Sequence, residues 1–418
     1  MSRKISGVKG MNDVLPASVG RWQAMERVAR EVFRLYGYGE VRTPVVEPAA
    51  LFARGVGETT DIVKKEMYVF EDKGEETLAL RPEGTAGVVR AYIEHGCHVE
   101  GPQKWFYIGP MFRRERPQKG RYRQFHQIGC ECLGVSEAGI DVDQIAMVDD
   151  FLGRLGVRAS LRLNSVGDAT CRPAYLAELK TYLVAHKDRL CPECNERIER
   201  NPLRVLDCKV EGCQQVLAHA PSLQDRLCEG CRGHFAAVRE GLDALGVAYR
   251  VDARLVRGLD YYVRTAYEFT SEAIGAQSAV AGGGRYDGLV ETLGGQPAPG
   301  IGFALGQERL LLVLEAQGDA PPPERPEVFF VTADPAGAKR APVLAAALRK
   351  AGIACDLDPR GGKLARQFKQ AERVRARFAL VLGEAEVESG LAKLKDLDTR
   401  AEEPVALSEL RSKLAEQG

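Results

Sequence analysis

An arginine-rich turn between two apolar segments constrains this chain more than any other feature. Residues 109–131 read GPMFRRERPQKGRYRQFHQIGCE, with six cationic side chains and one carboxylate between Arg113 and Arg123. This pattern predicts a β-hairpin that presents a polyanion site, because guanidinium groups grip phosphate oxygens through a planar fork. The alternative is a solvated basic turn. Polar Gln127 and Glu131 on a strand-like segment beside aromatic residues favour a ligand instead.

Length and composition predict a globular enzyme of two or three domains. The chain has 418 residues, of which 45% are hydrophobic and 28% charged, so long disorder is not expected. The formal net charge is zero, and nucleic-acid binding must therefore come from local patches. No segment resembles a signal peptide or could cross a bilayer, which predicts a cytoplasmic location. In that compartment the eleven cysteines are expected to be thiols or metal ligands.

The spacing of apolar residues predicts the order of the elements. Residues 16–36 have the period of an amphipathic helix, and residues 41–48 follow as a strand in which Pro44 indicates an edge or a subunit boundary. GIGFALG is expected to be a strand that runs into a helix near Gln307. The segment GDAPPPERPE predicts a linker. The residues after it alternate between β and α patterns, as in a small α/β domain with a mostly parallel sheet.

Four separate segments carry polar residues that could meet at one ligand. LRPEGT places Glu83 and Thr85 after a strand, and the arginine-rich hairpin follows it. LVRGLDYYVRT brings Arg257 onto a turn beside two tyrosines, and GIGFALGQERL places Arg309 in the first turn of a helix. Each segment alone is a weak signal. AGGGRYDG, in particular, fits neither the Walker pattern nor the dinucleotide fingerprint.

In order and identity, these segments resemble a histidyl-tRNA synthetase, a class II aminoacyl-tRNA synthetase, over essentially the whole chain. LVRGLDYYVRT and AVAGGGRYDGLV resemble the signatures that distinguish this family from other class II enzymes. The resemblance implies an α+β fold, in which helices flank an antiparallel sheet of six or seven strands. It also implies a helical Cys-rich insertion and a C-terminal α/β anticodon-binding domain. The implied segments are catalytic core 1–169 and 247–318, insertion 170–246, linker 319–327 and anticodon-binding domain 328–418.

The resemblance implies a two-step ligase reaction. ATP activates L-histidine to histidyl-adenylate with release of pyrophosphate, and histidine then passes to the 3′ end of tRNA(His). The nucleophile is already a carboxylate, so catalysis depends on positioning and charge stabilisation rather than on a side-chain base. By similarity, Arg113 and Arg257 are the catalytic residues at the α-phosphate. The other residues implied for ATP, which carries Mg²⁺, are Arg121 and Arg309 at the β and γ phosphates, Phe125 stacked on adenine, and Glu115 at its amino group.

The resemblance also implies a histidine pocket. Glu131 and Tyr262 are expected to read the imidazole nitrogens, and a ring read at both nitrogens excludes apolar isosteres strongly. The alternative is that these two side chains form an internal hydrogen-bonded pair. The implied histidine-binding residues are Glu83, Thr85, Gln127, Glu131, Arg257, Tyr261, Tyr262 and Tyr286.

Contacts to tRNA are expected from two basic regions. By resemblance, the hairpin loop with Arg116, Gln118 and Lys119 meets the acceptor end. Residues 360–377 carry seven cationic residues and one acidic residue. They predict a helix with a basic face for phosphate contacts and an apolar face of Leu364, Phe368, Ala371 and Phe378; the alternative is an ordinary solvated helix. The cations of that basic face are Lys363, Arg366, Lys369, Arg373 and Arg377.

Two CxxC pairs lie within the predicted insertion. Cys191 and Cys194 form the first, and Cys228 and Cys231 form the second. Such pairs are typical knuckles of a tetrahedral structural Zn²⁺ site. Cys208 and Cys213 lie between them, and the alternative is a group of six reduced thiols.

Two other functions remain open at this stage. Catalytically silent paralogues of the family bind histidine and regulate a phosphoribosyltransferase, but they typically lack parts of the arginine set and the C-terminal domain. A synthetase for another amino acid conflicts with LVRGLDYY. The family resemblance and the Pro44 segment also imply a homodimer.

Overall fold

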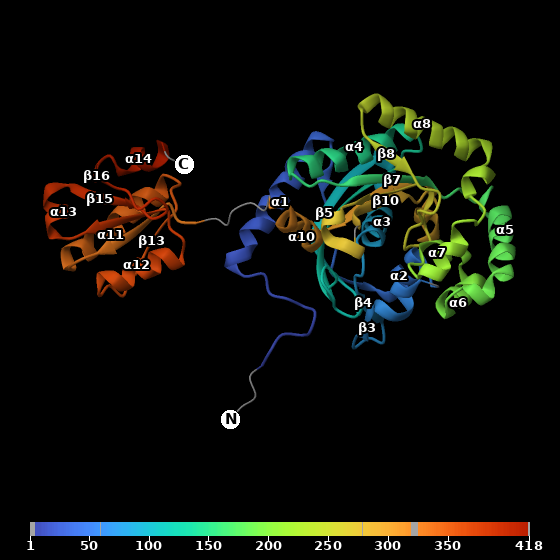
Figure 1. Cartoon of the computed structure of the whole chain (residues 1–418), viewed down its shortest axis with the longest axis horizontal. Coiled ribbons are helices and arrows are strands. Elements are labelled where there is room, and N and C mark those ends of the chain that lie inside the picture. Colours follow the sequence, from blue (N-terminus) through green and yellow to red (C-terminus); the bar gives the residue numbers. More distant parts are fainter. Residues whose placement is uncertain (1–4, 59, 278, 319–324, 417–418) are drawn as a thin grey trace. The chain divides into compact units, whose positions relative to one another are not determined.

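The computed structural model describes residues 5–58, 60–277, 279–318 and 325–416. They form two compact units that divide between residues 321 and 322 (Figure 1). The predicted α+β class is confirmed, because a large sheet flanked by helices forms the first unit and the second unit has its own sheet. Residues 319–324 of the predicted linker lie outside the described residues. None of the helices in the described ranges has the length and apolar composition needed to cross a membrane.

Eight strands form the central sheet of the first unit. They are β1 (Gly39–Glu40), β5 (Gln103–Phe112), β6 (Gln124–Leu133), β7 (Ser160–Ser165), β8 (Tyr249–Val251), β9 (Val263–Thr270), β10 (Ala279–Arg285) and β11 (Gly300–Gly306). Their spatial order is β1-β5-β6-β11-β10-β9-β7-β8. The six inner strands pair antiparallel, whereas the edge strands β1 and β8 pair parallel with β5 and β7. The expectation of six or seven strands is therefore too low, since these two short edge strands have no readable alternation.

Helices and a small second sheet complete the frame of this unit. The small sheet contains β2 (Val46–Pro48), β4 (Thr77–Leu80) and β3 (Tyr68–Glu71), in that order. The predicted N-terminal helix is confirmed as α1, which ends one residue before the expected boundary and buries Met25, Ala29, Val32 and Phe33. The helices outside the insertion are α1 (Pro16–Leu35), α2 (Ala49–Val56), α3 (Thr85–Glu94), α4 (Ala138–Arg154), α9 (Leu289–Thr292) and α10 (Gln307–Gln317).

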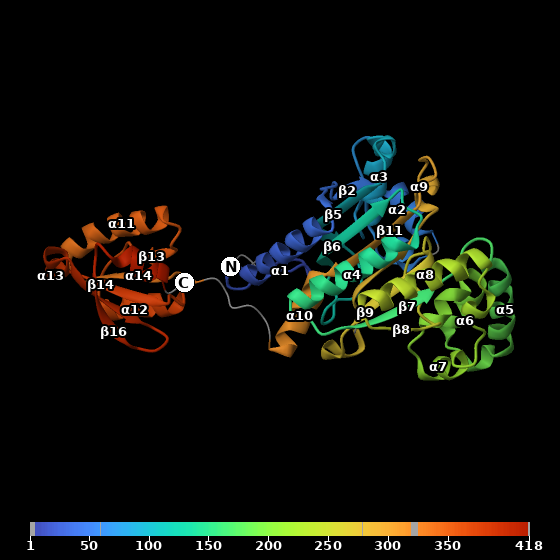
Figure 2. The same cartoon turned by 90° about the horizontal axis from the view of Figure 1, so that it is seen from above.

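The chain between β7 and β8 is helical. It contains α5 (Arg172–Ala185), α6 (Pro192–Arg200), α7 (Glu211–Leu217) and α8 (Glu229–Leu245). Helices α5, α6 and α7 gather beside one end of the large sheet, whereas α8 runs back along α4 (Figure 2). Their buried side chains form a hydrophobic cluster separate from the main core, to which Tyr262 and Ala266, just before and on β9, also belong.

The main core lies on one face of the large sheet. Side chains of α1, α4, α8 and α10 pack there against alternate residues of the strands. On β6, Ile128, Cys130 and Cys132 belong to this core, so Gln127 and Glu131 must point to the opposite face. Cys130 and Cys132 are fully buried in this core.

A buried ion pair fixes the end of β10 to α4. Arg285 and Asp141 are both fully buried, and Arg285 Nη2 lies 2.7 Å from Asp141 Oδ1. Arg285 also donates to the carbonyl oxygens of Val135 and Glu137 and pairs with Asp287. A buried guanidinium with so many partners holds its surroundings in one arrangement. The arginine of AGGGRYDG is therefore a structural residue.

The C-terminal unit has a mixed sheet of order β13-β12-β14-β15-β16. β12 pairs parallel with β13 and β14, but β14, β15 and β16 pair antiparallel. The expectation of a mostly parallel sheet is therefore wrong for its second half, because β15 and β16 each run antiparallel to the strand before them. The elements are β12 (Val328–Thr332), α11 (Pro335–Lys350), β13 (Cys355–Leu357), α12 (Leu364–Arg373), β14 (Phe378–Leu382), α13 (Glu384–Ser389), β15 (Leu391–Asp396), β16 (Glu402–Ala406) and α14 (Leu410–Glu416).

Candidate active site

A cavity with about 950 Å³ of empty space, part of it open to solvent, lies on the sheet face opposite the main core. Its lining comes from all four segments that the sequence singled out, together with β10. The predicted site residues that line it are Glu83, Thr85, Arg113, Glu115, Arg121, Phe125, Gln127, Arg257, Tyr261, Tyr262 and Arg309.

Three arginines from two remote segments gather at one end of the cavity. Arg113 and Arg121 come from the hairpin between β5 and β6, and Arg309 comes from the first turn of α10. Burial lowers the pKa of Arg309, and the positive charges of Arg121 and Arg113 lower it further. Cations that disfavour one another in this way need a polyanion to balance them.

Contacts to the protein hold these arginines in place. Arg113 Nε donates to the Pro82 carbonyl at 2.9 Å, and the Arg113 guanidinium lies 5.2 Å from the centre of the Phe125 ring. Arg309 donates to the carbonyl oxygens of Gly120 and Ala279 at 3.1 and 3.0 Å. Arg121 pairs with Glu115 at 3.2 Å. The charges are therefore oriented before any ligand arrives.

Arg257 reaches the cavity from the loop between β8 and β9. Its Nη1 lies 2.7 Å from Glu268 on β9, while its Nε is buried and has no hydrogen-bond partner among the described residues. Gly282 on β10 allows this approach, because a Cβ there would lie 2.1 Å from Arg257 Nη2. Gln127 Oε1 is a second buried polar atom without a partner in this cavity. Unpaired buried polar atoms that line a cavity are expected to bind a ligand.

The opposite end of the cavity is a buried chain of hydroxyls and carboxyls. Glu83 accepts hydrogen bonds from the backbone N–H groups of Thr85 and Ala86 at 2.9 and 2.8 Å, which caps α3. The Thr85 hydroxyl donates to Glu131 at 2.7 Å, and the Tyr286 hydroxyl donates to the other oxygen of Glu131 at 2.6 Å. Glu131 and Tyr286 thus lie directly behind Thr85 rather than on the cavity surface.

These contacts show that Glu131 does not form the internal hydrogen-bonded pair with Tyr262 that was the alternative to a ligand site. Within the described residues, its hydrogen-bond partners are Thr85 and Tyr286, not Tyr262. Tyr262 lines the cavity and stacks against Tyr261, with ring centres 4.7 Å apart, and Tyr261 packs edge-on against Tyr286. The three tyrosines form an aromatic wall that meets Glu131 through Tyr286.

The pKa of Glu131 predicts a pH dependence of stability. Burial raises this pKa from 4.5 to about 8, although the Tyr286 and Thr85 hydroxyls lower it. Between these values the unfolded chain releases the proton while the folded chain keeps it, so stability falls as pH rises, by up to about 1.4 kcal/mol per pH unit. Glu131→Gln removes the titration.

Urea unfolding of the wild type and Glu131→Gln, without ligands, tests this expectation between pH 5 and 9. As the pH rises, the variant should gain stability relative to the wild type up to about pH 8 and no further. Above that value, Glu131 of the wild type is ionised in the folded and in the unfolded chain alike. Burial also raises the pKa of Glu83, but this contribution is common to both proteins. A difference that is constant across the range would contradict the prediction.

Comparison with known proteins decides which family this site belongs to. The sequence model described as histidyl-tRNA synthetase matches residues 10–310, and the model described as anticodon binding domain matches residues 328–417. The chain belongs to the histidyl-tRNA synthetase family. The predicted family and its ligase class are thereby confirmed.

Individual relatives of this synthetase match along almost its whole length. The histidine–tRNA ligase of Anaeromyxobacter dehalogenans is 74% identical over 412 residues, which cover 99% of this chain and 100% of that protein. That of Syntrophotalea carbinolica is 48% identical over 415 residues and 99% of each chain. The crystal structure of apo histidyl-tRNA synthetase from S. aureus aligns with a TM-score of 0.80 and 36% identity, over 98% of this chain and 100% of that one.

The residues predicted to contact tRNA lie on exposed elements. Arg116, Gln118 and Lys119 are exposed in the hairpin loop. In the C-terminal unit, Lys363, Arg366, Lys369 and Arg373 are exposed on or just before α12. The predicted helix is too long, because α12 ends at Arg373. Arg377 therefore lies outside the helix, and Phe378 begins β14. Leu364, which was expected on the apolar face, is 40% exposed rather than buried. Val374 and Arg375 form the turn that precedes β14, and Arg375 has a positive φ.

The cysteines of the insertion group differently from the prediction. The predicted set of Cys191, Cys194, Cys228 and Cys231 does not form one cluster, because each CxxC pair meets other partners. The first pair meets two cysteines of the intervening segment, which gives the four-thiol cluster: Cys191, Cys194, Cys208 and Cys213. The second pair meets a DxxC segment after β7, which gives the Asp168 cluster: Asp168, Cys171, Cys228 and Cys231.

Sequence reasoning missed three residues that shape the cavity. Glu268 holds Arg257, Gly282 makes room for it, and Glu308 accepts the backbone N–H of His126 on β6. A glycine run inside a strand is a signal of close approach, and AGGG carried that signal. Nothing in the local sequence distinguished Glu268 from an ordinary strand residue.

Proposed function

We propose that this chain, a histidine–tRNA ligase, joins histidine to the 3′ end of tRNA(His) in two steps, the first of which takes place in the cavity. One observation carries the proposal: arginines from three remote segments face one cavity whose other end is lined by buried carboxyl and hydroxyl groups. A triphosphate suits the first end and an amino acid suits the second.

In the first step, the histidine carboxylate attacks the α-phosphate of ATP. We assign Arg113 and Arg257 to this phosphate, since both line the cavity and come from different walls. Their fixed charges would stabilise the negative charge that builds on the phosphate oxygens as pyrophosphate leaves. No side chain has to remove a proton, because the nucleophile is already ionised.

The other ATP contacts follow from the same end of the cavity. We assign the β and γ phosphates to Arg121 and Arg309, and the adenine to Phe125 and Glu115. The mutual effect of the arginine charges on Arg309 supports this assignment. The Mg²⁺ carried by ATP would neutralise part of the phosphate charge, and Glu308, which lines this side of the cavity, would supply a carboxylate oxygen to hold it.

Histidine is assigned to the opposite end. We propose that Glu83, Thr85 and Gln127 hold its amino and carboxylate groups, and that Glu131 and Tyr262 determine the choice of imidazole. The unpaired Gln127 Oε1 supports a polar ligand there. Arg257, Tyr261 and Tyr286 complete the pocket. Glu131 would act on histidine together with Thr85 and Tyr286, whose hydroxyls donate to its two carboxylate oxygens.

The second step requires tRNA at two places. We assign the acceptor end to Arg116, Gln118 and Lys119, because an exposed basic loop suits a single-stranded end. We assign the anticodon to the C-terminal unit, where the cations at positions 363, 366, 369 and 373 supply phosphate contacts. In this scheme segments 1–169 and 247–318 catalyse, 170–246 is an insertion, 319–327 is a linker and 328–418 binds the anticodon.

The proposal includes a cytoplasmic homodimer. The small sheet exposes Val46 and Phe70, by 39% and 43%, on the same face, and apolar side chains exposed in this way are suited to an interface. Light scattering should give twice the 45.7 kDa mass of the chain; a stable monomer would contradict the dimer.

Exchange of labelled pyrophosphate into ATP tests the catalytic assignment. Exchange should depend on histidine and should not occur with other amino acids. Absence of exchange, with histidine binding retained, would favour the regulatory paralogue instead. Exchange with a different amino acid would overturn the assignment of the pocket.

A further inference from the structure

We infer that the four-thiol cluster and the Asp168 cluster each bind one Zn²⁺ ion, so that the chain carries two separate structural zinc sites. Both clusters lie outside the catalytic cavity. In each, the candidate ligand atoms all lie within 4.8 Å of one another. This grouping replaces the single site that the two CxxC pairs suggested.

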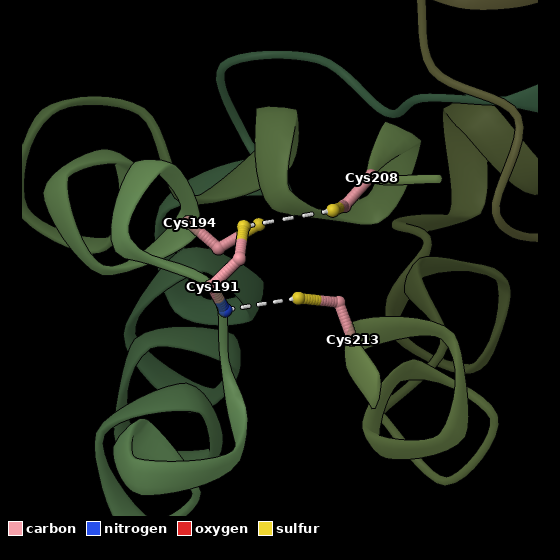
Figure 3. Close-up of side chains that lie close together, drawn as sticks. All are labelled: Cys191, Cys194, Cys208 and Cys213. Atoms are coloured by element: carbon pink, nitrogen blue, oxygen red, sulfur yellow. Dashed lines mark hydrogen bonds between the residues drawn. The ribbon is translucent and has the colours of Figure 1, made fainter. Parts of the chain in front are cut away.

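The four-thiol cluster has the dimensions of a tetrahedral zinc site. Cys191 and Cys194 lie at the start of α6, Cys208 follows a short 3₁₀ segment (Pro202–Asp207), and Cys213 lies on α7 (Figure 3). Cys191 Sγ and Cys208 Sγ are 3.9 Å apart. Four sulfurs at about 2.3 Å from one ion would be about 3.8 Å from one another.

Backbone N–H groups donate hydrogen bonds to two of these thiols. The Cys191 N–H donates to Cys213 Sγ at 3.1 Å, and the Val210 N–H donates to Cys208 Sγ at 3.5 Å. Such N–H donors orient metal-bound thiolates and reduce their charge. Cys194 and Cys213 are fully buried, which limits the access of water to the site.

The Asp168 cluster has matching dimensions with one oxygen ligand. Cys171 Sγ lies 3.9 Å from Cys231 Sγ, and Asp168 Oδ1 lies 3.6 Å from Cys171 Sγ and 3.8 Å from Cys228 Sγ. A tetrahedral ion with a carboxylate oxygen at about 2.1 Å and sulfur at about 2.3 Å would place these atoms about 3.6 Å apart. Asp168 and Cys171 have the same spacing as a CxxC pair, so the carboxylate replaces one cysteine.

The insertion needs metal cross-links because its short helices α6 and α7 bury few side chains. Helix α6 buries only Cys194 and Ile198 among its nine residues. Helix α7 has seven residues and buries Cys213, Val216 and Leu217. Helices of this length are marginal without strong tertiary contacts, and a bound metal ion supplies these contacts in small domains.

The two ions would have different structural roles. The four-thiol site joins α6 to α7 within the insertion. The Asp168 site joins the turn after β7 to the start of α8, and so fixes the insertion to the central sheet. Arg172, which follows Cys171, donates to the Tyr262 carbonyl at 2.6 Å. A direct neighbour in sequence of one ligand of the second site therefore contacts the wall of the cavity.

Metal content in full-length protein tests this inference. The protein is purified without a histidine tag or added zinc, and native mass spectrometry and elemental analysis count the ions per chain. Two zinc ions are expected. One ion, none, or iron in place of zinc would overturn the assignment, as would a denatured mass that has lost four hydrogens to two disulfides.

Single variants locate the two sites independently. Cys213→Ser and Cys228→Ser should each reduce the content from two ions to one, and the remaining ion shows that the chain is still folded. Cys355→Ser, in the C-terminal unit, is the matched control and should retain two ions. The two-site assignment fails if either cluster variant keeps both ions or loses both.

Discussion

Replacing Arg257 with histidine is expected to lower the rate of histidyl-adenylate formation by about 100- to 1,000-fold, which is the usual cost of removing one fixed donor from a developing negative charge. The guanidinium is held by Glu268 at 2.7 Å, and only 20% of its side chain is exposed. An imidazole is too short to occupy the same point. The change should therefore affect the transition state far more than the binding of either substrate.

The fold is expected to tolerate this change, because the Glu268 carboxylate still forms an ion pair with Arg162 when Arg257 is replaced. Arg162 Nη1 lies 3.3 Å from Glu268 Oε1. Single-turnover measurement of adenylate formation gives the rate, and calorimetry gives the affinities for histidine and for ATP. Arg254→His, an exposed change in the same loop, is the control. An unchanged single-turnover rate with weakened histidine binding would contradict the catalytic role of Arg257.

The sequence was sufficient to predict most of the residues that line the candidate cavity, because they lie in four short segments with distinct chemistry. Arg113, Arg121, Arg257 and Arg309 all line one cavity, and a surplus of guanidinium groups beside aromatic residues is visible without coordinates. The order of the segments revealed the family resemblance, which then supplied the expected role of each residue. Local patterns also predicted α1 and the β11–α10 junction.

Long-range partners were less accessible to sequence reasoning. Spacing showed that CxxC pairs exist, but it could not show that Cys191 and Cys194 meet Cys208 and Cys213. Asp168 carried no signal as a ligand, since single carboxylates are common after strands. In the same way, the Arg285–Asp141 ion pair joins residues 144 positions apart, and such contacts depend on the packing of β10 against α4.

Replacing Gly282 with alanine is expected to reduce adenylate formation by about 100-fold through Arg257 alone. The new Cβ would lie 2.1 Å from Arg257 Nη2 and 2.4 Å from its Cζ, so the guanidinium must leave its position. The guanidinium is the far end of a flexible side chain, and alanine suits the strand β10 at this position. The free energy of unfolding should therefore change much less than the rate. Gly288→Ala, in the same motif, has no heavy atom within 4 Å of the new Cβ and should leave the rate unchanged.

A double-mutant cycle separates this effect from direct obstruction of the cavity, which Gly282 also lines. If the alanine acts only by displacing Arg257, then Gly282→Ala should add little to the loss in Arg257→His, because the group it displaces is already absent. If the methyl group blocks ATP instead, the two losses should multiply and the KM for ATP should rise in both backgrounds. The second result would contradict the assigned role of the glycine. The first would show that one missing Cβ in a strand positions a charge contributed by a separate loop.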